Sequence, residues 1–417
     1  MEERSFWLAR LLVLGIVVSM TRAFAVTNLL EFVLICLVIW CPNLRASVFR
    51  TLVDPRILLT LIFLSWVGLS STWSEVAYQA RLEDVVSWRK LLLVPICFAL
   101  FKETKHKRIL KNTFVITCVG YLILSYCGYF GWITLDRDPS GVLENNSTQG
   151  IMFAAAGFFI ALTLPLKRQL WVKASLMVLI LAFFANILLL SQGRSGYLFV
   201  VVCVLGLVHF YSKKVILSRM LIFGALIIGA LIANQNTRDR IIQGVSEALY
   251  AFEEQPKVTS MGIRVVMWSN TLDIITANPM LGTGAGSFKS HYERTVNGVS
   301  GWRGTITDDP HQQYLHIAAE YGIIGLLLFI SCLFVWYLSD YTGEMIEARV
   351  YRVAAFTFLS GIVVTSFANG HFSTFVEGRF VWIFISALLA GSTIRSKMKV
   401  GTPKTTVPEY EAELPAK

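Results

Sequence analysis

Charged side chains are scarce in this sequence. Asp, Glu, Lys and Arg make up 15% of its 417 residues, whereas 55% of the residues are hydrophobic. Soluble proteins typically contain about 25% charged and about 45–50% apolar residues. The composition therefore excludes an ordinary water-soluble globular protein and indicates a chain that lies mostly within a lipid bilayer.

The sequence also lacks the patterns of a nucleic-acid-binding or metal-binding protein. Its net charge is +10, but the Lys and Arg residues occur in short clusters between apolar runs and form no basic stripe. We therefore expect no nucleic-acid partner. The seven cysteines are spread along the chain without metal-ligand spacing, mostly inside apolar stretches. We interpret them as small core residues.

Long apolar windows are what the sequence has in abundance. A helix needs about 20 largely apolar residues to cross a bilayer. The sequence predicts an all-α, polytopic membrane protein with about twelve transmembrane helices, near residues 6–21, 24–41, 57–71, 85–101, 113–131, 149–166, 170–190, 195–212, 216–233, 312–338, 350–370 and 378–394.

The distribution of basic residues predicts the orientation of these helices. Cytoplasmic loops are enriched in Lys and Arg. With the N-terminus inside, more than half of the 37 basic residues fall in inner segments, so we expect both termini in the cytoplasm. The predicted organisation is transmembrane helices 1 to 9 (1–233), an outer lobe (234–311), transmembrane helices 10 to 12 (312–395) and a cytoplasmic tail (396–417).

The outer lobe is expected to be helical. Apolar residues recur at spacings of three and four in 237–252 and 263–275, which is the pattern of an amphipathic helix. Asn278, Pro279 and a glycine-rich stretch at 282–288 then break this pattern. The glycines resemble a phosphate-binding loop only weakly, because no strand precedes them and no Lys follows at the required spacing. We expect a structural turn.

Chemistry on the outer side of a membrane has no ATP available, so the substrate must carry its own leaving group, as a lipid diphosphate does. The protein must then bind anionic oxygens and activate an acceptor. Arginine suits the first task, because its planar fork meets phosphate oxygens in pairs and stays charged when partly desolvated. A neutral histidine suits the second task as a general base.

Two arginines near the outer face are candidates for binding such an anion. Arg194 lies between two apolar windows and is flanked by Ser and Gly. A charge this close to hydrocarbon requires a partner, so Arg194 is either an anion ligand or a topology residue that reaches the membrane surface. Arg264 opens the second amphipathic segment, where a cation opposes the helix dipole unless an anion binds there. Its alternative is a solvated surface arginine.

The strongest local signal runs from Asp308 to His316. The acid and Pro310 precede a long apolar window, which predicts a helix capped by the acid with Pro310 in its first turn. His311 then lies at the positive end of the helix dipole, which favours the neutral imidazole that a general base requires. Tyr314 shares its face, one turn inward. A capping or headgroup-contacting histidine is the alternative for His311, and His316 is expected to be structural.

Other polar residues carry weaker signals. Asp136 and Asp138 have the spacing found in metal-dependent glycosyltransferases, but an ordinary loop explains them equally well. Glu31 falls inside an apolar window and therefore needs a partner, which the sequence does not identify. Arg89 marks the outer start of a window and is a second anion contact. His371 lies in a loop and has no specific signal.

Four motifs together carry a resemblance to a known family. They are the Gly- and Ser-flanked Arg194, GIRVVMW around Arg264, NPMLGTGAGSF after it, and HQQYLHIAAEYGIIGLLLF beginning at His311. Their order, spacing and predicted side resemble the O-antigen ligase and polymerase family over most of the C-terminal two thirds of the chain. The family motif has Asn after the histidine, where this chain has Gln312.

The resemblance implies a function and roles for these residues. It implies a bacterial inner-membrane protein with a periplasmic active site and a helical fold of the membrane glycosyltransferase type called GT-C. The donor would be an undecaprenyl diphosphate-linked glycan and the acceptor the lipid A-core, with His311 as the base and Arg194 and Arg264 as diphosphate ligands. The implied reaction is inverting and uses no metal and no cofactor.

Two kinds of alternative remain open at this stage. Within the family, polymerases join repeat units and related enzymes glycosylate proteins, and the sequence does not name the acceptor. A transporter of lipid-linked sugars belongs to another class. Transporters often show inverted repeats and charges at the membrane midplane, whereas this chain shows no repeat, and its candidates other than Glu31 gather at the outer face.

Overall fold

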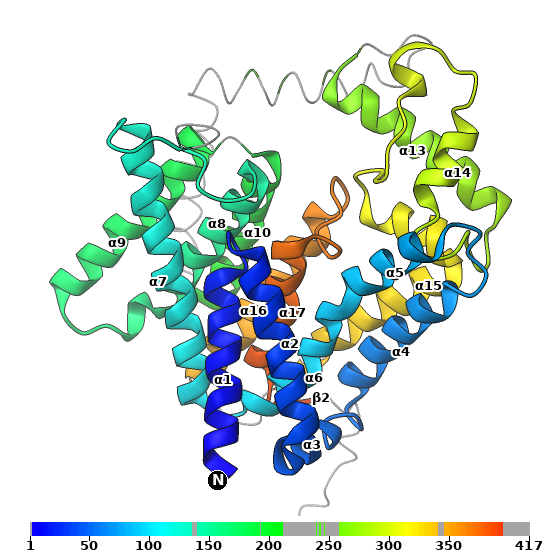
Figure 1. Cartoon of the computed structure of the whole chain (residues 1–417). Helices are drawn as coiled ribbons and strands as arrows, with labels where there is room; N and C mark the ends of the chain where they lie inside the picture. Colours follow the sequence, from blue (N-terminus) through cyan, green and yellow to red (C-terminus); the bar gives the residue numbers. More distant parts are fainter. Residues whose placement is uncertain are drawn as a thin grey trace, which may run out of the picture.

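The chain is helical over almost all of the part that can be described (Figure 1). Two short strands, β1 (Ser339–Asp340) and β2 (Thr393–Ile394), pair antiparallel. The expected all-α fold is confirmed. The computed structural model describes residues 2–135, 140–191, 193–211, 258–340 and 346–394, and within 212–257 only Asp239, Ile242 and Ser246.

Helices follow one another with short connections. In the first half these are α1 (Glu2–Ser19), α2 (Phe24–Trp40), α3 (Pro42–Phe49), α4 (Pro55–Ser70), α5 (Tyr78–Ser87), η1 (Trp88–Leu92), α6 (Leu93–Leu100), α7 (Thr104–Tyr129), α8 (Asn146–Thr163), η2 (Leu164–Leu166), α9 (Leu170–Ala185), η3 (Asn186–Leu190) and α10 (Arg194–Tyr211). In the second half they are α13 (Ser260–Ala277), α14 (Phe288–Thr295), η4 (Gly301–Gly304), α15 (Gln313–Tyr337), α16 (Ile346–Thr365) and α17 (Phe375–Leu389).

The apolar windows of the sequence correspond to these helices wherever the structure describes them. Six of the described helices or continuous helix pairs are long and apolar enough to cross a membrane, and a seventh if α2 and α3, bent by 96°, form one broken span. A polytopic membrane protein is therefore confirmed, while twelve spans and the GT-C type stay predictions. The window at 216–233, nearly all of the segment 237–252, Asp136 and Asp138, and the tail after residue 394 lie outside the described residues.

Two helices form the centre of the bundle. Every residue of α17 from Val376 to Leu389 is buried, and so is nearly all of α8. A helix that is apolar on all sides lies either in a protein core or in lipid, and the burial of these two helices places them in the protein interior. Aromatic rings join these helices to α16: Phe358 packs against Phe159 at 4.8 Å and against Phe380 at 5.2 Å between ring centroids. The outer helices instead expose large apolar side chains, which suit contact with lipid.

Helices α13 and α14 form a lobe at the end of the molecule opposite the N-terminus (Figure 1). The helical pattern expected at 263–275 is confirmed by α13. A small apolar cluster of Ile274, Phe288, Tyr292 and Val296 holds the lobe together against Ala319 of α15. The lobe therefore rests directly on the first turns of that long helix.

The expected glycine turn is confirmed, and it is joined to a break in α15. Gly322 has φ 68° and ψ −176°, so the helix is interrupted there. The carbonyls freed at this break accept hydrogen bonds from the turn, Ala319 from the Thr283 N–H at 2.9 Å and Glu320 from the Gly284 N–H at 2.8 Å. Because these amides are used within the protein, the turn does not cradle a phosphate.

Glycines also allow α8 and α10 to approach each other closely. A Cβ added at Gly196 would lie 2.8 Å from the Cα of Gly150, and one added at Gly193 would lie 2.6 Å from the Asn146 carbonyl oxygen. A larger side chain at either position would push the helices apart. These glycines flank Arg194, so the small residues beside it fix the position of the first turn of α10 against α8.

Candidate active site

Arg194 and Arg264, which are far apart in the sequence, lie within electrostatic range of each other. Arg194 is the first residue of α10 and its side chain is exposed. Arg264 lies in the first turns of α13 and is partly buried. Burial lowers the pKa of Arg264, the charge of Arg194 lowers it further, and the carboxylate of Asp309 opposes both effects. Two like charges and one acid therefore share this part of the surface.

His311 adopts an unusual backbone conformation beside this group. Its φ is 53°, the only positive value among the described residues other than glycine. The Asp309 carboxylate accepts a hydrogen bond from the His311 N–H at 2.7 Å, and its other oxygen lies 3.8 Å from the imidazole Nδ1. Left-handed conformations cost a residue with a Cβ about 1–2 kcal/mol, and such strain clusters at functional sites.

The helix start predicted at this segment is wrong in its details. Gln312 is the N-cap of α15, and its side-chain oxygen accepts a hydrogen bond from the Leu315 N–H at 2.6 Å. His311 and Pro310 precede the helix. The physical reason is that Asp309 holds the His311 N–H in a local turn, which leaves the cap to the next polar residue.

Helix α13 contacts this strained turn directly. The indole N–H of Trp268, one turn beyond Arg264, donates to the Pro310 carbonyl at 3.0 Å. This bond fixes the distance between the helix that carries Arg264 and the segment that carries His311. The side chain of His311 is 47% exposed, so an acceptor molecule can reach its imidazole.

Two further residues expected at the site have other partners. The Tyr314 hydroxyl donates to the Val363 carbonyl at 2.7 Å, so it joins α15 to α16 and its proton is not available to a substrate. Arg89 donates to the Val86 carbonyl and to Asn28, and lies 3.4 Å from Glu31. Its guanidinium therefore has contacts within the protein, its side chain is 30% exposed, and the expected anion contact stays a prediction.

The partner of Glu31, which the sequence did not identify, is Arg379. The Arg379 guanidinium donates to both oxygens of the Glu31 carboxylate, with Nη2 3.0 Å from Oε2. Arg89 forms a second ion pair with the same carboxylate. Arg379 lies in α17 and both side chains are almost fully buried. The pair satisfies a charge inside the bundle, as burial in a membrane protein requires.

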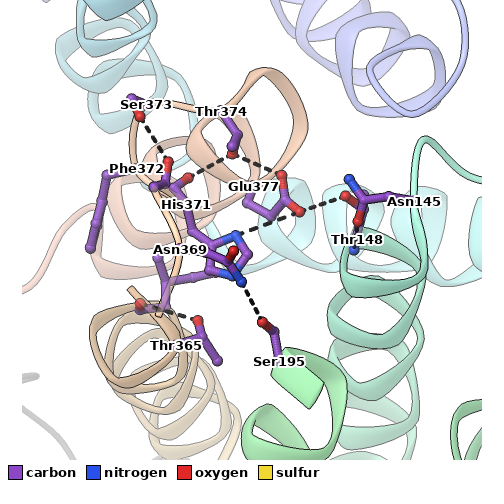
Figure 2. A network of polar contacts seen from close by, with 12 residues as sticks. Asn145, Thr148, Ser195, Thr365, Asn369, His371, Phe372, Ser373, Thr374 and Glu377 are labelled. Carbon is purple, nitrogen blue, oxygen red and sulfur yellow. Dashed lines mark hydrogen bonds and ion pairs between the residues drawn. The ribbon is translucent and has the colours of Figure 1, made fainter. Parts of the chain in front are cut away.

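A loop that sequence reasoning passed over connects the predicted site residues. The loop 366–374 joins α16 to α17 (Figure 2). Its Asn369 amide donates to the Ser195 hydroxyl at 2.8 Å, next to Arg194. The side-chain oxygen of Gln313, two residues after His311, accepts the N–H of Phe372 at 3.0 Å. The only sequence signal was a polar run between two apolar windows.

Comparison with known proteins supports the family seen in the motifs. A family model described as O-antigen ligase matches residues 179–330, a segment that contains Arg194, Arg264 and His311. An uncharacterized protein of Haemophilus influenzae is 26% identical over 280 residues, which cover 63% of this chain and 67% of that protein. The resemblance drawn from the motifs is confirmed over residues 179–330, where the chain is similar to the O-antigen ligase family.

Proposed function

We propose that this chain is an O-antigen ligase of the bacterial inner membrane. It transfers a glycan from undecaprenyl diphosphate to a lipid A-core acceptor at the periplasmic face. The observation that carries this proposal is the grouping of Arg194, Arg264 and Asp309 beside the strained His311. The group combines an anion-binding pair with a histidine whose ring is open to solvent.

The arginines bind the diphosphate of the donor. Within the described residues no hydrogen bond or ion pair to another residue engages the Arg264 guanidinium, and the charges that act on its pKa are those of Arg194 and Asp309. An anion between the two arginines relieves their mutual repulsion, and the planar fork of Arg264 can meet two of its oxygens. The charge that develops on the leaving diphosphate is then stabilised without a metal ion.

His311 activates the acceptor. Its imidazole takes the proton of an acceptor hydroxyl while the hydroxyl oxygen forms a bond to the anomeric carbon of the donor sugar. The bond from that carbon to the diphosphate oxygen breaks, and the electron pair leaves with the diphosphate. A single displacement inverts the anomeric centre. Both substrates are lipid-anchored at one membrane face, which supplies orientation.

The proposal is tested with the purified chain in lipid vesicles, given an undecaprenyl diphosphate-linked glycan and lipid A-core in the presence of a chelator. We expect glycosylated lipid A-core in the chelated sample. Transfer that requires added magnesium or manganese and is lost in an Asp136→Ala/Asp138→Ala variant would contradict the metal-independent mechanism.

The acceptor decides between related activities in the same assay. Elongation of the lipid-linked glycan alone would identify a polymerase, and transfer to a protein would identify a protein O-oligosaccharyltransferase. Movement of the donor across the vesicle membrane without any new glycosidic bond would identify a transporter. Each of these results would replace the ligase.

A further inference from the structure

His371 is a buried histidine that lacks hydrogen-bond partners. Its side chain is 3% exposed, and neither ring nitrogen has a hydrogen bond to a described residue. The Oε1 atom of Glu377 lies 3.7 Å from Nδ1, which is too far for a hydrogen bond. Buried polar atoms are almost always paired, and an unpaired one costs about 1–3 kcal/mol. The arrangement therefore calls for a further ligand.

Glu377 is held firmly in place from two sides (Figure 2). The Thr148 hydroxyl donates to its Oε1 at 2.6 Å, from the first turn of α8. The Thr374 hydroxyl lies 2.8 Å from Oε2 and also 2.8 Å from the His371 carbonyl. The carboxylate is thus fixed on the Nδ1 side of the imidazole, where its negative charge favours the tautomer that carries the proton on Nδ1.

The imidazole lies next to the proposed active site. A Cβ added at the neighbouring Gly370 would lie 3.2 Å from Oδ2 of Asp309, the acid that holds His311. Burial lowers the pKa of His371, with a further contribution from Arg264, against Glu377 and Asp309. A neutral ring with its proton on Nδ1 leaves Nε2 as a hydrogen-bond acceptor.

We propose that His371 is a substrate-binding residue whose Nε2 accepts a hydrogen bond from a glycan hydroxyl, with Glu377 as the residue that positions its ring. The inference rests on the proposed glycan transfer and adds a ligand to it. The hydroxyl belongs either to the acceptor sugar or to the first sugar of the donor. Both present the same chemistry, and the kinetics distinguish them.

The test compares two substitutions of similar length in the vesicle assay. His371→Gln keeps an acceptor oxygen near the position of Nε2, whereas His371→Met fills similar space without one. We expect His371→Met to raise KM for either donor or acceptor roughly tenfold, with kcat within about twofold, because one hydrogen bond is lost. His371→Gln should restore most of the affinity. The KM that changes identifies the substrate bound.

His106→Met is the matched control, since this histidine lies near Glu103 at the predicted inner face and should leave both constants unchanged. If His371→Met fails to fold, Glu377→Gln replaces it and should raise the same KM by a smaller factor. Unchanged KM values for both substrates, or a loss of active protein at constant KM, would overturn the inference while the transfer activity stands. A wild-type chain that transfers no glycan overturns both proposals.

Discussion

Arg56 and Arg264 lie toward opposite ends of the bundle and differ in how their donors are used. Arg56, at the start of α4, is 1% exposed and bonds to both oxygens of Asp54, to the hydroxyls of Ser339 and Ser392 and to the Ser392 carbonyl. Arg264, in the lobe, has electrostatic neighbours but no such bonds to the described residues.

The difference separates an arginine that holds the fold together from one that we propose binds an anion. A guanidinium whose five donors are satisfied by protein has nothing left for a ligand, and its removal costs stability. A guanidinium placed beside another guanidinium stabilises the fold little, and its donors remain available for an anion. We therefore expect substitution of Arg56 to lower the stability of the fold, and substitution of Arg264 to weaken donor binding.

The largest expected effect is at His311. His311→Ala and His311→Gln should lower the rate of transfer by roughly 10²- to 10⁴-fold, since the base is lost, while thermal unfolding in detergent stays near that of the wild type. His311→Gly is the matched control, because it removes the base and also relieves the positive φ. Near-normal transfer by the Ala and Gln variants would rule out the general base.

At the other end, Arg56→Ala should affect stability and leave donor KM unchanged in the protein that folds. Removing the guanidinium leaves Asp54 and the Ser339 and Ser392 hydroxyls without their partner, at a cost of about 3 kcal/mol. The melting temperature in detergent measures this loss. A higher donor KM in the Arg56→Ala variant would remove the distinction between the two arginines.

Arg194→Lys and Arg264→Lys test the binding end of the comparison. An ammonium group cannot reproduce the bidentate fork, so donor affinity should fall roughly 10- to 100-fold in each variant. Donor binding is measured by titration of vesicles with the lipid diphosphate. Arg294→Lys, on an exposed lobe arginine near Glu75, is the control, and full donor affinity in both test variants would make these arginines topological.

The smallest expected effect concerns Asp84 of α5, below the lobe. Burial and the nearby Glu320 raise its pKa from 3.8 to about 7, and its Oδ2 accepts the Tyr321 hydroxyl at 2.7 Å. The unfolded chain releases this proton first, so stability falls as pH rises from about 4 to about 7. Asp84→Asn should reduce that fall in melting temperature, whereas Asp273→Asn, on the lobe surface, should not.

The sequence predicted what depends on composition and short spacing. Apolar windows predicted the helices, and the break after Ala277 predicted the glycine turn. It could not predict contacts across the bundle. The pairing of Glu31 with Arg379 joins residues 348 positions apart, and no local pattern carries that information. The N-cap of α15, Gln312, was not predicted because Asp308 and Asp309 precede it and are also capable of capping a helix.

The candidate site was predicted in part for the same reason. The motifs pointed to Arg194, Arg264 and His311, and the structure brings Arg264 within electrostatic range of Arg194 and Asp309. The loop 366–374 joins α10 to α15 through the hydrogen bonds of Asn369 and Gln313. No local sequence pattern indicates these contacts. The glycines beside Arg194 allow α10 to approach α8 closely, a contact that the sequence did not indicate.

The fastening of the glycine turn to the break at Gly322 also determines where the chain tolerates changes of length. Helix α13 reaches α15 through the turn, whose Gly282 backbone is so close to Glu320 and Gly322 that a Cβ there would lie 2.5 Å from each. An inserted residue between 279 and 284 would shift Arg264 relative to His311. The segment 297–307 is largely exposed and lies beyond this fastening, so an insertion there should leave the distance between Arg264 and His311 unchanged.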